Sequence, residues 1–256
     1  MRRLVVIGIG TGNPEQITIE AVNAMNAAAV LFTVDKGAGK QDLLDARREI
    51  CARYLTGHPR IVEVRDPERD RAAEAYREAV EAWDEARAEA YEQAVAAELD
   101  DDGCGAFLVW GDPSLYDGTL RVLARMAARG KIAFEYSVVP GITSVQALAA
   151  RHRIALTGIG EPVQITTGRR LAAEGMPSGI DNVVVMLDGG TSFDRVATDD
   201  VDIYWGAYLG TDDELLAAGP LPRSAPAIAA TRRDARERRG WIMDTYLLRR
   251  RGREGA

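Results

Sequence analysis

The rest of this sequence can be arranged around one segment, Phe107-Leu108-Val109-Trp110-Gly111-Asp112-Pro113. Its apolar residues predict a buried strand, and Pro113 ends that strand because proline lacks a backbone donor and has a fixed φ. Gly111 would let a ligand approach the backbone closely, and Asp112 would place a carboxylate at the carboxyl end of the strand. Ligands bind at this edge of open α/β sheets. A simple tight turn is the alternative interpretation, so the neighbouring segments have to distinguish the two.

A second apolar strand, residues 4–9, opens the chain and leads into a glycine-rich loop at residues 8–14. A dinucleotide-binding fold requires the spacing G-x-G-x-x-G, in which the last glycine packs helix against strand. Asn13 occupies that last position here, and the nearest acidic residue after the next strand, Asp35, is out of the expected register. A nicotinamide-dependent oxidoreductase is therefore an alternative of a different class, which the sequence disfavours.

Strands and helices alternate through the first half of the chain. Strands are predicted at residues 29–34, 61–64 and 132–136, and helices at residues 15–28, 42–54 and 119–129. Later strands are predicted at residues 163–167, 182–187, 201–207 and 241–248, the last two with the aromatic character of edge strands. This pattern predicts an α/β fold with two α/β domains, residues 1–114 and 115–256, and a cleft between them near residues 113–119.

Two segments stand apart from this alternation. Residues 70–99 contain neither proline nor glycine, and apolar residues recur in them at helical spacing, which favours a long surface helix. Pairing of this helix as a coiled coil is the alternative. A protein that only binds partners through it is a third functional hypothesis, but that hypothesis leaves the glycine-rich loops unexplained. Residues 219–226 are predicted to be a loop.

Composition and charge exclude several classes of protein. The net charge is −7, which argues against a nucleic-acid surface as the main function. No apolar run approaches the length of a membrane span, and the apolar start at residues 4–9 is too short to predict a signal peptide. Cys51, Cys104 and the two histidines form neither a disulfide framework nor a metal site. We expect a cytoplasmic homodimer without a metal, a nucleic-acid partner or a membrane partner.

A further loop, Pro140-Gly141-Ile142-Thr143-Ser144, follows the predicted strand at residues 132–136. It would lie at the same sheet edge as the loops at residues 8–14 and 110–113. The sequence shows no Ser-His-Asp or Cys-His arrangement, and His58 and His152 are each interpreted as structural or exposed. A pocket lined by backbone and short hydroxyl side chains suits chemistry that a cofactor performs.

These segments resemble the signatures of a known family. Residues 8–14 followed by Gln16-Ile17-Thr18, then the Trp110-Gly111-Asp112-Pro113 loop, then residues 138–144 look like three signatures of the tetrapyrrole methylases, in the right order. Within this family the chain is most similar, at residues 33–37, 166–171 and 241–248, to members that methylate precorrin-5 at C1 with loss of its acetyl group, giving precorrin-6A. A methylase acting at another precorrin position is the alternative within the family.

The resemblance implies S-adenosyl-L-methionine as cofactor, bound between two α/β domains, with S-adenosyl-L-homocysteine as its product. The loop at residues 110–113 would surround the methionine part, and residues 186–187 and 208–210 would lie on the adenine side. The implied cofactor-binding residues are Trp110, Gly111, Asp112, Leu115, Tyr116, Thr143, Ser144, Val145, Met186, Leu187, Tyr208, Leu209 and Gly210.

The resemblance also implies that the N-terminal glycine-rich loop faces a small-molecule tetrapyrrole, through Gly10, Thr11, Gly12 and Pro14. Precorrins carry acetate and propionate groups, which arginine and lysine can bind. The candidates for these contacts are Lys36, Arg121, Arg169 and Arg170, each of which has a solvated surface position as its alternative.

Two residues are candidates for catalysis. Asp35 is expected at the carboxyl end of a strand, where it could orient or deprotonate a water, although a cap of the following turn is the alternative. Tyr116 could donate a hydrogen bond to the carbonyl oxygen of the acetyl group. Both roles are hypotheses that rest on position alone.

Overall fold

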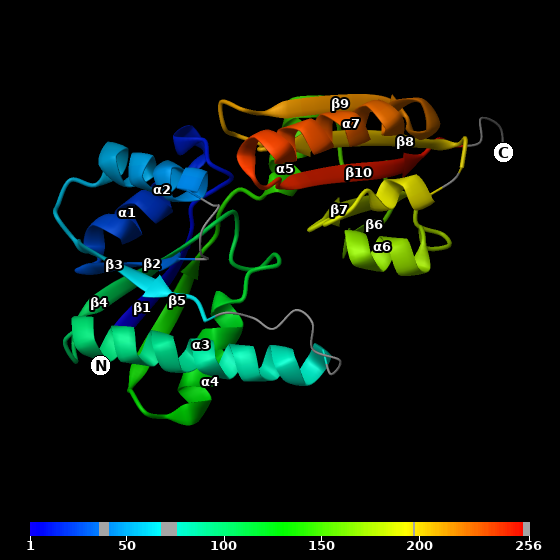
Figure 1. The fold of residues 1–256 in the computed structure, drawn as a ribbon. Helices are drawn as coiled ribbons and strands as arrows, with labels where there is room; N and C mark the ends of the chain where they lie inside the picture. The colour runs from blue at the N-terminus through cyan, green and yellow to red at the C-terminus, as the bar shows by residue number, and fades with distance from the viewer. Residues whose placement is uncertain (36–40, 68–75, 197, 253–256) are drawn as a thin grey trace. The chain divides into compact units, whose positions relative to one another are not determined.

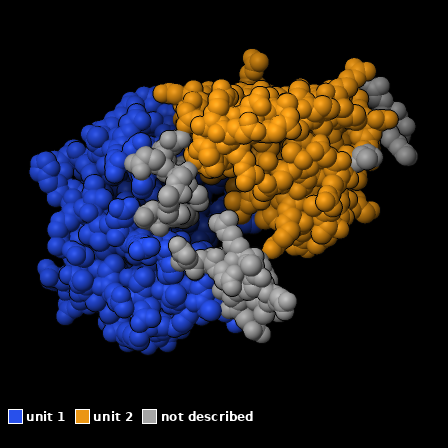
Figure 2. Space-filling view, viewed as in Figure 1, with its two compact units in different colours: residues 1–143 blue, residues 144–256 orange. Residues whose placement is uncertain are grey.

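The computed structural model describes residues 1–35, 41–67, 76–196 and 198–252. The chain forms two compact units, Met1–Thr143 and Ser144–Ala256, which Figure 2 colours separately. Each unit contains one five-stranded sheet and the helices that cover it. The prediction of an α/β fold is confirmed. None of the described helices combines the length and the apolar character that crossing a membrane requires.

The sheet of the first unit is parallel throughout, in the order β3-β2-β4-β1-β5 (Figure 1). Its strands are β1 (Arg2–Gly8), β2 (Val30–Asp35), β3 (Arg60–Arg65), β4 (Cys104–Val109) and β5 (Phe134–Val139). Residues 105–109 of β4 are all buried, as expected for a strand that has helices on both faces of the sheet. The predicted strand before Gly111 is therefore the centre of this sheet.

Helices cover both faces of the first sheet (Figure 1). They are α1 (Ile19–Ala27), α2 (Gln41–Tyr54), α3 (Tyr76–Glu98) and α4 (Thr119–Arg129), with a short 3-10 helix, η1 (Pro14–Gln16), before α1. Met25 of α1 and Ile50 of α2 pack on one face, next to Leu31. The other face carries α3 and α4. Buried residues alternate between the two cores along β2 and β4, so the apolar runs of these strands supply both cores.

The long predicted helix exists and its apolar side belongs to the core. Ala88, Tyr91 and Val95 of α3 are fully buried against the sheet and α4. The Tyr91 ring stacks on that of Phe107, with 4.9 Å between the ring centroids. Part of the predicted helix, residues 70–75, lies outside the described residues. The spacing of apolar residues in α3 is thus explained by packing on its own sheet.

The sheet of the second unit is mixed, in the order β6-β7-β10-β8-β9. Its strands are β6 (Val163–Thr167), β7 (Asn182–Met186), β8 (Val201–Ala207), β9 (Leu215–Pro220) and β10 (Asp244–Arg250). The prediction that the strands near residues 201–207 and 241–248 are edge strands is wrong, because β8 and β10 pair on both sides. Their aromatic residues Trp205 and Tyr246 are core residues instead.

The helices of the second unit are α5 (Ser144–His152), α6 (Gly168–Glu174) and α7 (Leu221–Arg239), with a short 3-10 helix, η2 (Ser192–Arg195). The prediction of a loop at residues 219–226 is wrong, because β9 ends and α7 begins within it. Proline is tolerated in the first turn of a helix, where the missing N–H has no partner to lose. Pro220 and Pro222 therefore mark the start of a helix.

The boundary between the units lies later in the chain than residues 114–115, where the sequence analysis placed it. The segment in between contains α4 and β5. β5 pairs with β1 along its whole length, and α4 packs against the same core as α3. Both elements therefore belong to the first unit.

Candidate functional site

Three backbone loops converge at the carboxyl ends of β1, β4 and β5 in the first unit. A Cβ atom built on Gly8 would lie 2.6 Å from the Gly141 nitrogen and 2.7 Å from the Gly111 oxygen. Real Cβ atoms do not approach backbone so closely, so these loops can meet only because glycine stands at Gly8 and Gly141. The three predicted loops therefore meet at Gly8, Gly111 and Gly141, all of which belong to this unit.

A two-residue bridge joins two of these loops. The Gly111 N–H donates to the Gly10 carbonyl oxygen at 2.8 Å, and the Gly10 N–H donates to the Gly111 oxygen at 3.3 Å. Both glycines have positive φ, 81° at Gly10 and 68° at Gly111. A Cβ built on Gly111 would meet no described atom of the protein within 4 Å. Gly111 itself is buried, but its Cβ direction points into open space, so a side chain at this position would enter that space.

Asp112 fixes the loop after β4 to the loop after β5. Its Oδ2 accepts a hydrogen bond from the Gly141 N–H at 2.8 Å, and its Oδ1 accepts from the N–H and the hydroxyl of Ser114. Burial alone would raise the pKa of this carboxyl, but the hydrogen bonds from Ser114 and Gly141 outweigh burial and lower the pKa below its ordinary value. The sequence analysis expected Asp112 to contact the cofactor, whereas both of its oxygens serve donors of the protein.

Three of the predicted site residues have an unusual backbone conformation. Among the described residues, the non-glycine residues with positive φ are Tyr116, Arg153, Leu187 and Tyr208. A left-handed conformation costs an L residue free energy, and such residues concentrate at ligand sites. Tyr116 and Leu187 are also exposed, at 43% and 60%. Three of these four residues, all except Arg153, are among the residues that the family resemblance implies for the cofactor.

The remaining predicted cofactor residues near residues 110 and 144 are partly or fully buried. Trp110 packs against the core between the first sheet and its helices α1 and α2, and Leu115 is half-buried. Thr143 is buried at the end of the first unit. In the second unit, the Ser144 hydroxyl accepts a hydrogen bond from the Thr245 hydroxyl at 2.8 Å, and Val145 is a core residue of α5.

The segment at residues 208–210 forms a closed turn in the second unit. The Tyr208 hydroxyl donates to the Trp241 carbonyl oxygen at 2.6 Å, and Leu209 is buried. The Gly210 N–H donates to the Glu214 carboxylate at 2.9 Å, and this carboxylate also pairs with Arg151 of α5 at 2.7 Å. Met186 is half-buried at the end of β7, directly before the exposed Leu187.

The glycine-rich loop of the first unit holds most of the predicted tetrapyrrole contacts. Thr11 is buried, and its hydroxyl donates to the Gln16 side chain at 2.8 Å. Gly12 is buried with φ 125°, and Pro14 begins η1. Asn13, which breaks the dinucleotide spacing, caps η1 by accepting from the Glu15 N–H. The loop thus turns into a capped 3-10 helix.

The described residues among the predicted cations are divided between the two units. Arg121 of α4 is exposed and pairs with Asp84 at 3.3 Å in the first unit. Arg169 and Arg170 are exposed at the start of α6 in the second unit. Lys36 lies outside the described residues. Asp35 ends β2, as predicted, but its side chain is not described.

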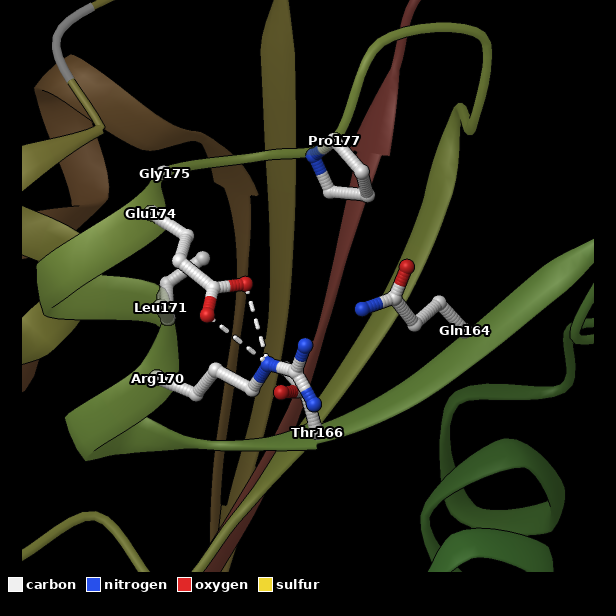
Figure 3. A pocket seen from close by; sticks show the side chains of 7 residues that line it. All are labelled: Gln164, Thr166, Arg170, Leu171, Glu174, Gly175 and Pro177. Carbon is white, nitrogen blue, oxygen red and sulfur yellow. Dashed lines mark hydrogen bonds and ion pairs between the residues drawn. The ribbon is translucent and has the colours of Figure 1, made fainter.

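Arg170 lines a pocket of about 110 Å³ between β6 and α6 (Figure 3). Its Nε donates to both oxygens of Glu174, at 2.9 and 3.0 Å. Gln164 and Thr166 of β6 and Pro177 close the opposite side of the pocket. The pocket is thus lined by amide and hydroxyl groups and by the Arg170 guanidinium, which is already paired with the Glu174 carboxylate.

The sequence analysis missed a buried polar network in the second unit. Asp188, Arg232 and Asp244 are buried charged residues, joined to Trp205 and Tyr246 by hydrogen bonds. One signal was available, since Asp188 follows a continuous apolar strand and precedes Gly189 and Gly190. Its partners lie far along the chain, so spacing alone does not reveal them.

Comparison with known proteins identifies the family. The family model of Tetrapyrrole (Corrin/Porphyrin) Methylases matches residues 3–224. "Precorrin-6A synthase [deacetylating]" from Sinorhizobium sp is 51% identical over 250 residues, which cover 97% of this chain and 95% of that protein. A cobalamin synthesis related protein (CobF) from Corynebacterium diphtheriae has a crystal structure with a TM-score of 0.86 and 40% identity, covering 98% of this chain and 100% of that one.

A more distant structure shares the fold. Uroporphyrin-III C-methyl transferase from Thermus thermophilus, complexed with S-adenyl homocysteine, has a TM-score of 0.61 and 17% identity, covering 96% of this chain and 91% of that one. The family model spans most of the sequence, and the relative from Sinorhizobium aligns over nearly the whole of both chains. This chain therefore belongs to the tetrapyrrole methylase family.

Proposed function

We propose that this protein is an S-adenosyl-L-methionine-dependent C-methyltransferase of cobalamin biosynthesis, which methylates precorrin-5 at C1 and releases its acetyl group to give precorrin-6A. The observation that carries this proposal is the 51% identity to a precorrin-6A synthase [deacetylating] over 97% of the chain. A cytoplasmic location and a homodimer are parts of the same proposal.

The residues at the candidate site fit the proposed cofactor. The Cβ direction of Gly111 points into open space, and Tyr116, Leu187 and Tyr208 hold strained turns at segments that we assign to the cofactor. When bound, S-adenosyl-L-methionine would supply a methyl group to a nucleophilic ring carbon, with S-adenosyl-L-homocysteine as the leaving group. The remaining cofactor contacts that we propose are Trp110, Leu115, Thr143, Ser144, Val145, Met186, Leu209 and Gly210, with Asp112 holding the loops in place.

The role that we propose for the protein residues is to align the tetrapyrrole with the methyl group of the cofactor and to exclude water. The electron-rich ring carbon of the reduced tetrapyrrole needs no activated protein nucleophile, so a fixed approach supplies most of the catalysis. We assign the glycine-rich loop at residues 10–14 to the macrocycle. Arg170 and its neighbour Arg169 are proposed to bind a carboxylate, because Arg170 already lines a polar pocket.

Release of the acetyl group is proposed to be hydrolytic. Methylation makes C1 quaternary, and water then attacks the acetyl carbonyl carbon. The bond from that carbon to the ring breaks, the ring keeps the electron pair and takes up a proton, and the acetyl group leaves as acetate. Asp35 is proposed to orient or deprotonate the water, and Tyr116 to donate to the carbonyl oxygen. The proposal contains no acyl-enzyme step.

The experiment that tests the proposal is incubation of the purified protein with precorrin-5 and methyl-labelled S-adenosyl-L-methionine. Mass spectrometry of the pigment is expected to show one added methyl and the loss of acetyl, with acetate in equal amount. A methylated pigment that retains its acetyl group would point to a methylase of another precorrin position. Calorimetry should show binding of S-adenosyl-L-homocysteine and none of NAD, whereas the reverse result would favour an oxidoreductase.

A further inference from the structure

Leu187 has a conformation that its own side chain does not explain. Its φ is 53°, in the left-handed region, and the side chain is 60% exposed. An exposed leucine gains little from burial that could offset an unfavourable backbone conformation. The stabilisation must therefore come from the residues next to it in the second unit.

The next residue, Asp188, is buried and its carboxylate is fully satisfied. Oδ2 accepts from the Ser192 N–H and the Tyr246 hydroxyl, both at 2.8 Å. Oδ1 accepts from the Gly190 N–H at 3.0 Å and the Ser192 hydroxyl at 2.9 Å. Four donors thus draw the Asp188 side chain into the core, which forces the backbone to turn at Leu187.

A second layer of the network holds the backbone of Asp188. The Arg232 guanidinium of α7 donates to the Asp188 carbonyl oxygen, and its Nε donates to Asp244 Oδ2 at 2.9 Å. The Trp205 indole donates to the same Asp244 oxygen at 2.8 Å. The network therefore connects α7, β8 and β10 to the end of β7.

The Tyr246 hydroxyl can donate its hydrogen bond to Asp188 throughout the neutral pH range. Burial, and then the neighbouring Asp188 carboxylate, raise the pKa of its phenol, so it stays protonated at neutral pH. Gly168, at the start of α6, leaves no room between itself and Asp188, since a Cβ there would overlap the carboxylate. This packing gives a structural reason for glycine within residues 166–171, one of the segments that resemble the family.

We infer that Asp188, Arg232 and Tyr246 are positioning residues, which hold Leu187 in its left-handed conformation and keep residues 186–187 in the shape that the cofactor needs. This inference rests on the proposed function, because it takes residues 186–187 as a cofactor contact. The network touches no reacting group, so it acts on cofactor affinity through the backbone.

The test is Tyr246→Phe, which removes one hydroxyl and keeps the ring in place. We expect the Kd for S-adenosyl-L-homocysteine to rise about tenfold, the scale of losing one buried hydrogen bond. At saturating S-adenosyl-L-methionine, kcat should stay within about twofold, because the network contacts no reacting atom. Hydrogen exchange of amides 187–192 should be faster than in the parent protein.

Tyr204→Phe is the matched control, because Tyr204 lies on β8 of the same sheet but packs edge-on against His152, away from Asp188. Its Kd should match that of the parent protein. Ser192→Ala gives a second variant, which removes one donor to Asp188 Oδ1 and should weaken binding in the same direction.

Two results would overturn the inference. One is a lower Tm in Tyr246→Phe and Ser192→Ala with an unchanged Kd at a temperature where both are folded, which indicates a structural role only. The other is no change in either quantity. Failure of the parent protein to bind S-adenosyl-L-homocysteine would instead contradict the proposed function, so the two failures are distinguishable.

Discussion

The Asp112 carboxylate accepts a hydrogen bond from the Gly141 N–H at 2.8 Å, across 29 residues of sequence. The two residues follow β4 and β5, which flank β1 in the sheet. One side chain therefore sets the spacing of two loops at the candidate site. The Gly141 N–H belongs to the backbone, so its position is set by the end of β5 and not by a side-chain rotamer.

Replacing Asp112 with Asn should lower stability, because an amide offers one acceptor where the carboxylate serves donors with both oxygens. We expect a loss of about 0.5–1.5 kcal/mol in the free energy of unfolding, the usual net contribution of one hydrogen bond, because Asp112 is only partly buried. Urea denaturation measures it. Asp45→Asn is a suitable control, since Asp45 is exposed on α2.

The same contact should depend on pH. The pKa of Asp112 is lowered in the folded protein, from an ordinary value of 3.8. The stabilisation is therefore fully present above pH 3.8 and disappears as the pH falls through the lower folded value. The difference in unfolding free energy between the parent protein and Asp112→Asn should shrink in that acidic range. A difference that stays constant down to the lowest pH at which both fold would contradict this assignment.

Replacing Gly111 with Val should abolish binding of S-adenosyl-L-homocysteine and leave the fold intact. The new Cβ would meet no described protein atom within 4 Å, and the two methyl groups would extend into the open space where we place the cofactor. The positive φ should cost about 1–2 kcal/mol of stability. Calorimetry and circular dichroism measure the two effects.

Gly130→Val separates strain from blockage of the site. Gly130 ends α4 with φ 63°, and a Cβ there also meets no described atom within 4 Å. This variant should show a comparable loss of stability with normal cofactor binding. If Gly111→Val binds as tightly as Gly130→Val, the loop at residues 110–113 is only a turn.

Sequence patterns predicted the helices and strands whose bounds are determined by their own residues. The helix predicted at residues 119–129 matches α4, because its apolar stripe ends at Gly130, whose left-handed conformation favours glycine. The strands at residues 163–167 and 201–207 also match β6 and β8. The convergence of the glycine loops followed from the rule that parallel strands end at one edge of a sheet.

Sequence patterns failed where contacts between distant segments determine a strand, its place in the sheet or the partner of a side chain. β9 reads Leu-Leu-Ala-Ala-Gly-Pro, which has no β-branched residue, and it is a strand only because β8 offers it partners. The edge-strand prediction for β8 and β10 failed because strand order cannot be derived from residue type. The role of Asp112 and the network behind Leu187 were hidden for a related reason, since Gly141 and Tyr246 are far from them in sequence.

Truncating Arg169 and Arg170 together to alanine should weaken tetrapyrrole binding and leave the affinity for S-adenosyl-L-homocysteine unchanged. KM for precorrin-5 is expected to rise about tenfold or more, since charge-assisted bonds to carboxylates are among the stronger contacts. Glu174→Ala is the control, because it breaks the same Arg170–Glu174 ion pair and keeps both cations. Equal losses in the double variant and in Glu174→Ala would assign the effect to helix α6 instead.

The sharpest prediction concerns the two steps of the proposed reaction, because they should separate in variants of Asp35 and Tyr116. Asp35→Asn cannot take a proton from water, and Tyr116→Phe cannot donate to the acetyl carbonyl oxygen. Each should still transfer the methyl group, since alignment and not acid–base chemistry drives that step. Loss of acetyl should slow by about 10²–10⁴-fold, the usual contribution of a general acid or base.

A single-turnover experiment followed by mass spectrometry should therefore show a methylated pigment that keeps its acetyl group for longer than in the parent protein. Tyr136→Phe, on the exposed edge strand β5, serves as control and should release acetate at the parental rate. An Asp35→Asn variant that methylates and releases acetate at the full rate would remove Asp35 from the mechanism. The same outcome for Tyr116→Phe would exclude the Tyr116 hydroxyl from the mechanism and leave only the strained backbone of this residue, at φ 55°, to be explained.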